Sequence, residues 1–261
     1  MAKPKVTVII PVHNTEKYLE ECLNSIFNQT LEDVQIICVD DGSSDNSYGI
    51  LYDNKDKITL IQTDGKGASV ARNEAFKLAK GSYTAFLDAD DTIPKDYLEC
   101  LYKEAKRSKA DVVITGFNFN RGTSVTKFKN PLPVGIYSDF SDKLKALYNG
   151  ALWNKLFKTS LIKKNKLTFE EGRMWEDNLF VIQALYYSDL VSVIHEPYYN
   201  YRINENSVTN SSKLAQKRAD DAKYIYTKTM EFTESIELNE KNIKEVEAFL
   251  KGKAMPNYIL N

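Results

Sequence analysis

The first ninety residues contain four short apolar runs that alternate with helical or turn-forming segments, and this alternation limits the fold more than any other feature. The runs lie at residues 6–10, 34–39, 58–61 and 83–87. They are continuously apolar and largely β-branched, which is typical of strands covered on both faces in a parallel sheet. Strands that alternate with helices require right-handed crossovers. The sequence therefore predicts an α/β fold with a mostly parallel open sheet and helices on both faces.

Polar clusters follow these runs directly, at residues 11–16, 40–45, 63–67 and 88–91. The carboxyl ends of parallel strands lie at one edge of a sheet, and open α/β sheets bind ligands beyond that edge. Loop polarity alone does not explain four such clusters at the same edge. We therefore expect a ligand site where the clusters meet.

The pattern changes after residue 120, and we expect three parts: residues 1–120, 121–210 and 211–261. The second part opens with a polar loop at 121–133, and the third is a smaller helical portion with modest apolar stripes. Periodicity predicts helices at 68–80, 95–108, 139–149, 159–164, 176–187, 212–236 and 240–251, and extended segments at 111–119, 152–157, 191–194 and 198–202.

Charge and cysteine content argue against several classes of protein. Lys and Arg number 35 and Asp and Glu 36, so a net charge of -1 gives no overall attraction for nucleic acid. Cys22, Cys38 and Cys100 lack zinc-site spacing and an even count, which indicates buried thiols in a reducing compartment. No apolar stretch approaches ~18 residues, and the run at 6–10 is too short for the core of a signal peptide. We expect a cytoplasmic protein that binds no nucleic acid.

Asp88 and Asp90 end the fourth apolar run as an Asp-x-Asp pair. Side chains two apart on extended chain point the same way, ~7 Å apart along it. Hard cations such as Mg²⁺ bind carboxylate oxygens and keep waters or substrate phosphates as further ligands, so the pair suits a metal-phosphate substrate. From these residues alone another interpretation stays open, in which Asp91 or Thr92 caps a helix entered through Pro94.

Four motifs, in this order and spacing, resemble the nucleotide-sugar half of family 2 glycosyltransferases. They are VIIPVHN at 8–14, VDDGSSD at 39–45, GASVARN at 67–73 and LDADD at 87–91. Two later motifs resemble acceptor and diphosphate motifs of bacterial members that build capsules, exopolysaccharides or teichoic-acid decorations: Trp175-Glu176-Asp177, and Tyr201-Arg202 with Ser207. His13 departs from the family, where an aromatic such as Tyr is more usual. The resemblance implies a GT-A fold, with residues 1–120 as the nucleotide-sugar half and 121–210 as the acceptor half.

The resemblance also implies a donor site for a nucleotide sugar, with UDP as the nucleotide. Asp88 would contact the ribose or the metal, and Asp90 would be the direct ligand of Mn²⁺ or Mg²⁺. Arg72 would steady Asp88 and the nucleotide, although a surface ion pair is an alternative. Asp40, which only accepts hydrogen bonds, would receive the imide N–H of uracil, whereas Asp41 and Asp45 suit turn formation better. Further residues would border the nucleotide: Pro11, Val12, His13, Asn14, Glu16 and Ala89.

Arg202 and the hydroxyl of Ser207 would complete a diphosphate clamp, because a guanidinium matches phosphate bidentately. Family 2 enzymes invert the anomeric centre and need one general base, which the resemblance assigns to Asp177. As isolated residues, Glu176 and Asp177 would simply open a helix, where negative charge is favoured. The remaining candidates, each with a structural alternative, are Trp153 and Trp175 as sugar-stacking or core aromatics, His195 as a metal neighbour or loop residue, and Lys155 as an acceptor contact or solvated lysine.

Two rival functions stay open. Gly65-Lys66-Gly67 follows a strand and opens a helix, as in dinucleotide-dependent oxidoreductases, but Val70 replaces the third glycine. A non-catalytic sugar-binding protein of the same fold is the other rival. The expected partners are a nucleotide-sugar donor and a saccharide or lipid-linked acceptor. The helices after Ser212 could cap the acceptor cleft, pair two subunits or rest on the inner face of the plasma membrane, but their mixed charge favours a solvated face.

Overall fold

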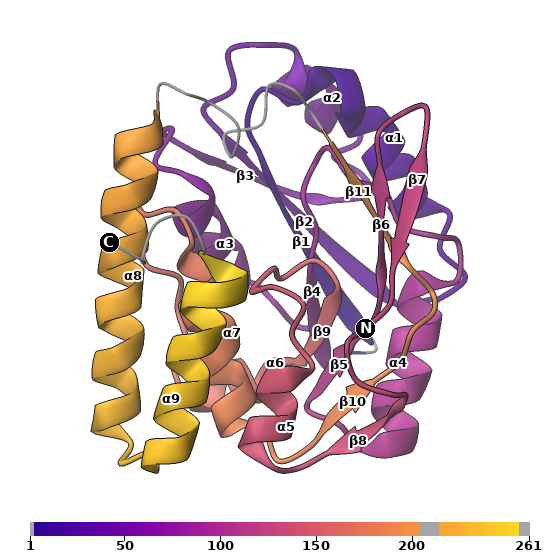
Figure 1. Ribbon diagram of the computed structural model, residues 1–261. Coiled ribbons are helices and arrows are strands. Elements are labelled where there is room, and N and C mark those ends of the chain that lie inside the picture. Colours follow the sequence, from indigo (N-terminus) through magenta and orange to yellow (C-terminus); the bar gives the residue numbers. More distant parts are fainter. Residues whose placement is uncertain (1–2, 204–213, 256–261) are drawn as a thin grey trace.

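The computed structural model describes residues 3–203 and 214–255. An eight-stranded sheet forms its centre, in the order β3-β2-β1-β4-β9-β5-β10-β8, and all neighbours are parallel except those of β9 and β8 (Figure 1). A three-stranded sheet, β11-β6-β7, lies beside it. The predicted α/β class with a mostly parallel open sheet is confirmed.

The strands are β1 (Val6–Val12), β2 (Val34–Asp41), β3 (Thr59–Thr63), β4 (Tyr83–Phe86), β5 (Val112–Ile114), β6 (Phe117–Asn120), β7 (Val125–Phe128), β8 (Gly135–Tyr137), β9 (Lys155–Lys158), β10 (Val191–Val193) and β11 (Tyr199–Arg202). The helices are α1 (Glu16–Phe27), α2 (Ser47–Asp53), α3 (Ala68–Lys77), α4 (Tyr97–Ser108), α5 (Phe140–Lys145), α6 (Thr159–Lys164), α7 (Glu176–Tyr187), α8 (Ala215–Ser235) and α9 (Glu240–Phe249), which continues as a π-helical turn, η3 (Leu250–Ala254).

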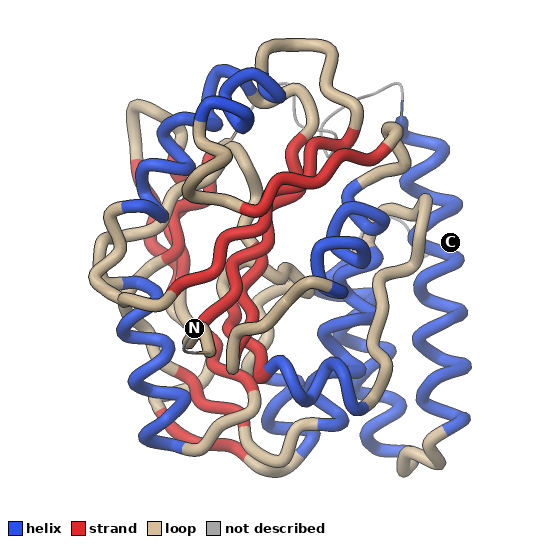
Figure 2. Tube along the Cα trace, turned by 180° about the vertical axis from the view of Figure 1, so that it is seen from behind, coloured by secondary structure: helices blue, strands red, loops and turns tan. Residues whose placement is uncertain are grey.

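Alternate residues of the central strands feed two hydrophobic cores, one on each face of the sheet. Ile9 and Ile37 point to the face that α3, α5, α6 and α7 cover, and α8 and α9 pack outside them. Val8 and Ile10 point to the face covered by α1 and α4. Figure 1 shows these two layers on the left and right of the sheet, and Figure 2 shows the same layers from behind. Burial on both faces explains why the runs are continuously apolar.

The expected single strand at 111–119 is wrong, because the chain bends at Thr115 and Gly116 and enters two sheets. β5 joins the central sheet, and β6 joins the small one. A Cβ on Gly116 would lie 2.7 Å from the Phe128 carbonyl oxygen, so only glycine permits this close approach. The expected loop at 121–133 contains β7, which pairs with β6. These strands are too short for an alternation of apolar and polar residues to be recognised in the sequence.

The C-terminal helices are present as expected, and they lie on one side of the molecule. α8 packs against α7, and α9 packs against α5 and α8 (Figure 1). Several helices are shorter than periodicity predicts: α4 begins at Tyr97 instead of residue 95, and α5 ends at Lys145 instead of residue 149. These differences lie at helix ends, where periodicity is least informative.

Candidate active site

The Asp88–Asp91 segment forms a tight turn beyond β4. The strand ends at Phe86, and the Asp91 N–H donates to the Asp88 carbonyl over 3.2 Å. The turn buries Ala89 and leaves Asp88 and Asp90 partly exposed. The expected strand-like alternation is therefore wrong, and a turn presents the two carboxylates on either side of a buried alanine.

Asp91 does not cap the next helix, which corrects the alternative raised by the sequence. α4 begins at Tyr97 with Asp96 at its N-cap. The Asp91 side chain is 1% exposed and accepts hydrogen bonds from the Tyr199 hydroxyl (2.8 Å) and the Arg202 N–H (2.7 Å). Burial, with the nearby charges of Asp88 and Asp90, raises the pKa of Asp91 well above its ordinary value. Asp91 thus ties the acidic turn to β11.

Arg72, on α3, joins the acidic turn to the start of α7. Its guanidinium donates to Asp88 Oδ1 over 3.1 Å and to Glu176 Oε1 over 2.8 Å. The side chain is 10% exposed, so the alternative of a surface ion pair is wrong. Burial would lower the pKa of Arg72, but the carboxylates of Asp88 and Glu176 outweigh it and raise that pKa. Burial raises the pKa of Glu176, and Arg72 opposes the rise.

Asp177 follows on the first turn of α7 and is partly buried. Burial raises its pKa to about 7, and the charge of Glu176 adds to the rise, while Arg72 and Lys155 oppose it. Lys155, at the start of β9, is 1% exposed, so the expectation of a solvated lysine is wrong. Its ammonium donates to the Ala151 carbonyl and to Asn154 Oδ1, and burial lowers its pKa to about 7. Burial therefore brings the pKa of both Asp177 and Lys155 to about 7.

The predicted donor edge of the site is set by strand register. Val12 lies opposite Asp40 in the parallel β1–β2 pair, and the Leu87 N–H donates to the Ile9 carbonyl, which brings Asp88 beside the end of β1. Pro11 is partly exposed, whereas the Val12 side chain is buried in the core. Asp40 is 3% exposed, and its Oδ1 atom has no hydrogen-bond partner among the described residues. A buried orphan acceptor of this kind suits a ligand N–H.

Asp41, the next residue, has a structural role. Its carboxylate accepts the N–H groups of Lys66 (2.9 Å) and Gly67 (2.6 Å) and the Thr63 hydroxyl (2.6 Å). Burial alone would raise the pKa of Asp41, but these hydrogen bonds outweigh it and lower that pKa. The carboxylate therefore fixes the β3–α3 loop beside the end of β2.

His13, Asn14 and Glu16 are exposed and hold the β1–α1 loop against the β2–α2 loop. His13 Nδ1 lies 2.7 Å from the Asp41 carbonyl oxygen. Asn14, at a φ of 52°, accepts the Ser44 N–H over 2.8 Å, and Glu16 accepts the Asn46 N–H over 2.8 Å. These contacts shape the rim of the donor edge.

The family model described as "Glycosyl transferase family 2" matches residues 7–169, well over half of the chain. The chain belongs to glycosyltransferase family 2. EpsH of Bacillus subtilis is 30% identical over 96% of this chain and 75% of its own length. The poly(ribitol-phosphate) beta-N-acetylglucosaminyltransferase TarS of Staphylococcus aureus is 28% identical over 76% of this chain. The match to this chain covers only 35% of the TarS sequence.

Solved structures show the same fold. TarS residues 1–349 in complex with UDP-GlcNAc give a TM-score of 0.80 at 24% identity, over 95% of this chain and 72% of that one. The mannosyltransferase PcManGT from Pyrobaculum calidifontis, in complex with GDP-Man and Mn²⁺, gives a TM-score of 0.67 at 19% identity, over 96% of this chain and 70% of that one. At these identities the likeness concerns the fold, and the predicted GT-A architecture is confirmed.

No helix within residues 3–203 and 214–255 is long and apolar enough to cross a membrane.

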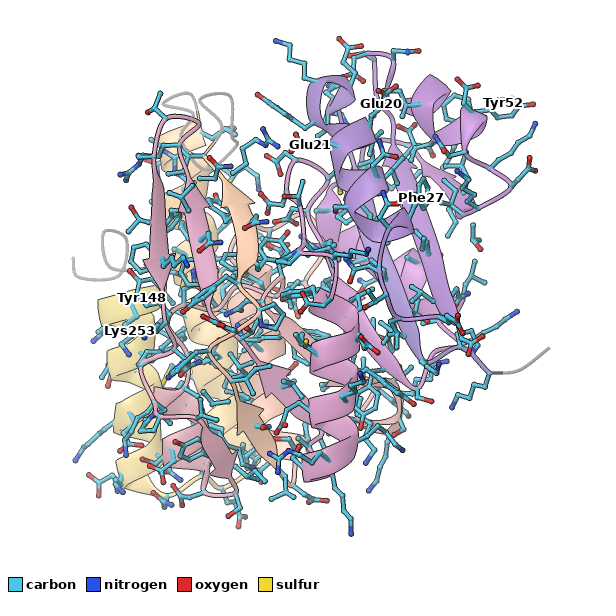
Figure 3. The ribbon with its side chains drawn as sticks, turned by 90° about the vertical axis from the view of Figure 1, so that its right-hand side faces the viewer. Glu20, Glu21, Phe27, Tyr52, Tyr148 and Lys253 are labelled. Carbon is cyan, nitrogen blue, oxygen red and sulfur yellow. The ribbon has the colours of Figure 1, made fainter. Side chains whose placement is uncertain are left out.

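Arg202 of this glycosyltransferase lies against the acidic turn. Its Nε donates to the Asp90 carbonyl over 2.9 Å, its Nη2 pairs with Glu21 of α1, and its guanidinium carbon lies 5.0 Å from the centre of the Tyr18 ring. Figure 3 shows Glu21 on α1, on the opposite side of that view from Tyr148 and Lys253. Ser207 lies outside the described residues.

The acidic turn offers two carboxylates to a metal, Asp88 and Asp90. Within the described ranges, no group of three or more His, Cys, Asp or Glu side chains is arranged to hold a metal ion. A cation at this turn would need further ligands from water or substrate phosphate, which is how Mg²⁺ is usually held. The residues present therefore fit a cation that binds together with a diphosphate.

Trp153, Trp175 and His195 each have contacts within the protein. Trp153 is 7% exposed and stacks on Tyr199 and Tyr201 at centroid distances of 4.7 and 5.4 Å. Trp175 precedes α7, and its indole N–H donates to the Arg218 carbonyl over 3.3 Å. The carbonyl of His195, which lies between β10 and β11, accepts the Gly116 N–H.

Three residues that matter to this site were not identified from the sequence. Glu176 belongs to the Trp175-Glu176-Asp177 motif and opens a helix, but neither pattern predicts its ion pair with Arg72. The Tyr199 hydroxyl donates to Asp91, and Glu21 pairs with Arg202. The position of Glu176 next to the predicted base, Asp177, was a signal in the sequence that could have identified it as a site residue. Nothing in the local sequence distinguishes Tyr199 or Glu21 from the other tyrosines and exposed acids.

Proposed function

We propose that this enzyme is an inverting, metal-dependent transferase that moves a sugar from a UDP-sugar to a saccharide or lipid-linked saccharide in the synthesis of a cell-surface polysaccharide. One observation carries the proposal: Arg72 binds Asp88 at the donor edge and Glu176 beside Asp177. It therefore connects the predicted nucleotide side to the predicted base. The UDP-GlcNAc complex of TarS and the poly(ribitol-phosphate) in its name support a UDP-sugar donor and a polymer acceptor.

In this reaction Asp177 takes the proton of the acceptor hydroxyl as the hydroxyl oxygen bonds to the anomeric carbon. The bond from that carbon to the β-phosphate oxygen breaks, and UDP leaves from the opposite face, so the configuration inverts. Asp177 has a pKa of about 7, which makes it a stronger base than an ordinary aspartate while it is still largely ionised above neutral pH. Proton removal of this kind typically contributes ~10²–10⁴-fold to the rate.

Asp90 and Asp88 would hold the divalent cation, Mn²⁺ or Mg²⁺. The bound cation would offset the negative charge that develops on the departing diphosphate. Arg202, whose Nε binds the Asp90 carbonyl, would bring a further positive charge to the same phosphates. Asp40 would accept the imide N–H of uracil with its orphan Oδ1 atom.

The oxidoreductase alternative loses its support at the β3–α3 loop. A dinucleotide-binding loop needs free backbone N–H groups for the pyrophosphate at the start of a helix. Here the N–H groups of Lys66 and Gly67 are bound to the Asp41 carboxylate. They are therefore unavailable to a pyrophosphate in this conformation.

Thermal-shift titration tests the donor assignment. We expect UDP with Mn²⁺ to raise the free energy of unfolding by about 2.7 kcal/mol when the UDP concentration is one hundred times its Kd. UDP alone or NAD should raise it much less. Asp90→Asn should remove the metal-dependent part of the shift, whereas Asp56→Asn, at an exposed acid outside the site, should keep it. Stabilisation by NAD and not by UDP would reject the proposal.

Asp177→Asn tests the base. We expect this variant to bind UDP as the wild type does and to lose transfer by ~10²–10⁴-fold, because amides do not accept the proton. NMR of the product linkage reports inversion. Retained transfer would assign Asp177 to helix capping, and retained anomeric configuration would exclude direct displacement.

A further inference from the structure

The 170–175 segment leads into α7, and α8 holds it along its length. The Tyr224 hydroxyl donates to Glu170 Oε2 over 3.1 Å, and Lys217 Nζ donates to the Gly172 carbonyl over 2.8 Å. The Trp175 indole N–H donates to the Arg218 carbonyl. Figure 1 shows α8 running beside α7, and the two helices pack against each other. The C-terminal portion of the enzyme is thus attached to the segment that precedes the predicted base.

Asp221 is the centre of this attachment. Its side chain is 2% exposed and accepts three hydrogen bonds, from Arg173 Nη1 (3.0 Å), the Met174 N–H (3.0 Å) and Lys217 Nζ (2.6 Å). Burial would raise the pKa of Asp221, but these bonds outweigh it and lower that pKa. Arg173 also lies over the Tyr224 ring, 4.2 Å from its centre. A buried, ionised aspartate therefore binds both the main chain and a side chain of the segment.

The end of the segment has an unfavourable backbone conformation that needs such support. Trp175 has a φ of 67°, in the left-handed region, which is costly for a bulky residue. Its carbonyl accepts the Asn178 N–H over 3.0 Å and the Asn178 side-chain amide over 3.1 Å. The conformation of Trp175 therefore sets the first turn of α7, where Asp177 lies two residues later.

Side chains of α3 bind the two ends of this region, and Asn73 also donates to Glu171 near its start. The side-chain amide of Asn73, on α3, accepts the Phe169 N–H over 2.9 Å and donates to the Phe169 carbonyl over 3.0 Å. Arg72 binds Glu176. Between these anchors, Asp221 accepts the main-chain N–H of Met174, directly before the left-handed residue.

We propose that Asp221 is a positioning residue for the general base: by holding Arg173 and Met174, it fixes the left-handed Trp175 and so the orientation of Asp177 toward the acceptor. The proposal rests on the assignment of Asp177 as the base. In this proposal the C-terminal helices contribute to the reaction by positioning the general base on the acceptor side, and not by binding the donor nucleotide.

Asp221→Asn removes the charge and keeps the shape. The matched control is Asp220→Asn, because Asp220 is exposed and accepts a hydrogen bond from Gln216 one turn away. Hydrolysis of UDP-GlcNAc and UDP-glucose with Mn²⁺ gives kcat and its pH profile, since water can replace the acceptor. We expect Asp221→Asn to lower kcat about tenfold or more and to move the acid limb of the profile, with the Kd for UDP unchanged within about twofold. Asp220→Asn should match the wild type.

A second measurement reports the geometry without activity. The chain has two tryptophans, so 5-fluorotryptophan labelling gives two ¹⁹F resonances, and a Trp175→Phe variant assigns them. Asp221→Asn should shift the Trp175 resonance and leave that of Trp153 in place. An unchanged Trp175 resonance, an unchanged pH profile, or equal losses in kcat and UDP affinity would each overturn the proposal. Asp177→Asn is measured in parallel: if it keeps hydrolysis and transfer, the base assignment fails, whereas failure of Asp221→Asn alone rejects only the positioning role.

Discussion

The proposed donor side and the proposed acceptor side of the active site are built in different ways. On the donor side, backbone ladders between β1, β2 and β4 place Pro11, Asp40 and Asp88 at one edge. On the acceptor side, Asp177 lies in the first turn of α7, and the position of this turn depends on side-chain contacts with α3 and α8. A backbone ladder tolerates most single substitutions, whereas a site held by a few buried charges can be lost with one. We therefore expect mutations on the two sides to separate nucleotide binding from transfer.

Arg72 is the residue where the two sides meet, and its loss should have the largest effect. Arg72→Met leaves Asp88 and Glu176 without their shared cation, and breaking a buried ion pair typically costs ~3–5 kcal/mol. We expect a clear fall in the urea midpoint, together with loss of transfer. Arg72→Lys should recover only part of both, because an ammonium does not provide the planar fork of the guanidinium. A stable, active Arg72→Met variant would show that the two sides are held by other contacts.

Asp41→Asn tests the donor side alone. The substitution weakens three hydrogen bonds to the β3–α3 loop, and we expect a loss of about 1–3 kcal/mol at pH 7, measured by urea unfolding. The folded pKa of Asp41 lies below its ordinary value, so its contribution is present above that ordinary value and is lost as pH falls through the folded pKa. The difference between variant and wild type should therefore shrink in acid.

Asp40→Asn is the matched comparison for Asp41→Asn. Because Asp40 Oδ1 has no hydrogen-bond partner among the residues that the structure describes, this variant should keep its stability and lose UDP affinity. An equal loss of stability in both variants would contradict the division between a structural and a binding aspartate.

Lys155→Met tests the electrostatics of the acceptor side. If Asp177 is the base, as proposed, transfer needs its ionised form. Its pKa is about 7, so we expect the rate to fall about tenfold per pH unit in acid below that value. Lys155 opposes the rise in the pKa of Asp177, so its removal should move the acid limb to higher pH. A pH–rate profile of kcat/KM measures the shift. A limb at the same pH in both proteins would mean that another group titrates.

Glu74→Gln should have the smallest effect, and it provides a baseline on the same helix as Arg72. Glu74 pairs with Lys77 over 2.7 Å, but both side chains are well exposed. Exposed pairs of this type contribute at most ~1 kcal/mol. Urea unfolding and transfer should both remain close to wild type. A loss comparable with that of Arg72→Met would contradict the distinction between buried and exposed ion pairs.

The sequence predicted the fold and the shared edge of the polar clusters well, because both depend on local patterns. Each apolar run and its polar cluster are contiguous, and parallel strands necessarily end at one edge. The predictions for 111–119 and 121–133 were wrong because short strands of a second sheet carry too few residues for a period. The helix-cap alternative for Asp91 was wrong because local sequence does not show that Tyr199 and Arg202, over a hundred positions later, are its partners.

The sequence by itself determined the open α/β sheet, the polar edge, and the family resemblance that the family match confirms. Tertiary structure decided which charges meet. Arg72 and Glu176 are 104 positions apart, and Arg173 and Asp221 are 48 apart. With 35 basic and 36 acidic side chains, the sequence permits very many pairings. Only the packing of α3, α7 and α8 selects these few, because a buried charge is stable only where an opposite charge or hydrogen bonds compensate it.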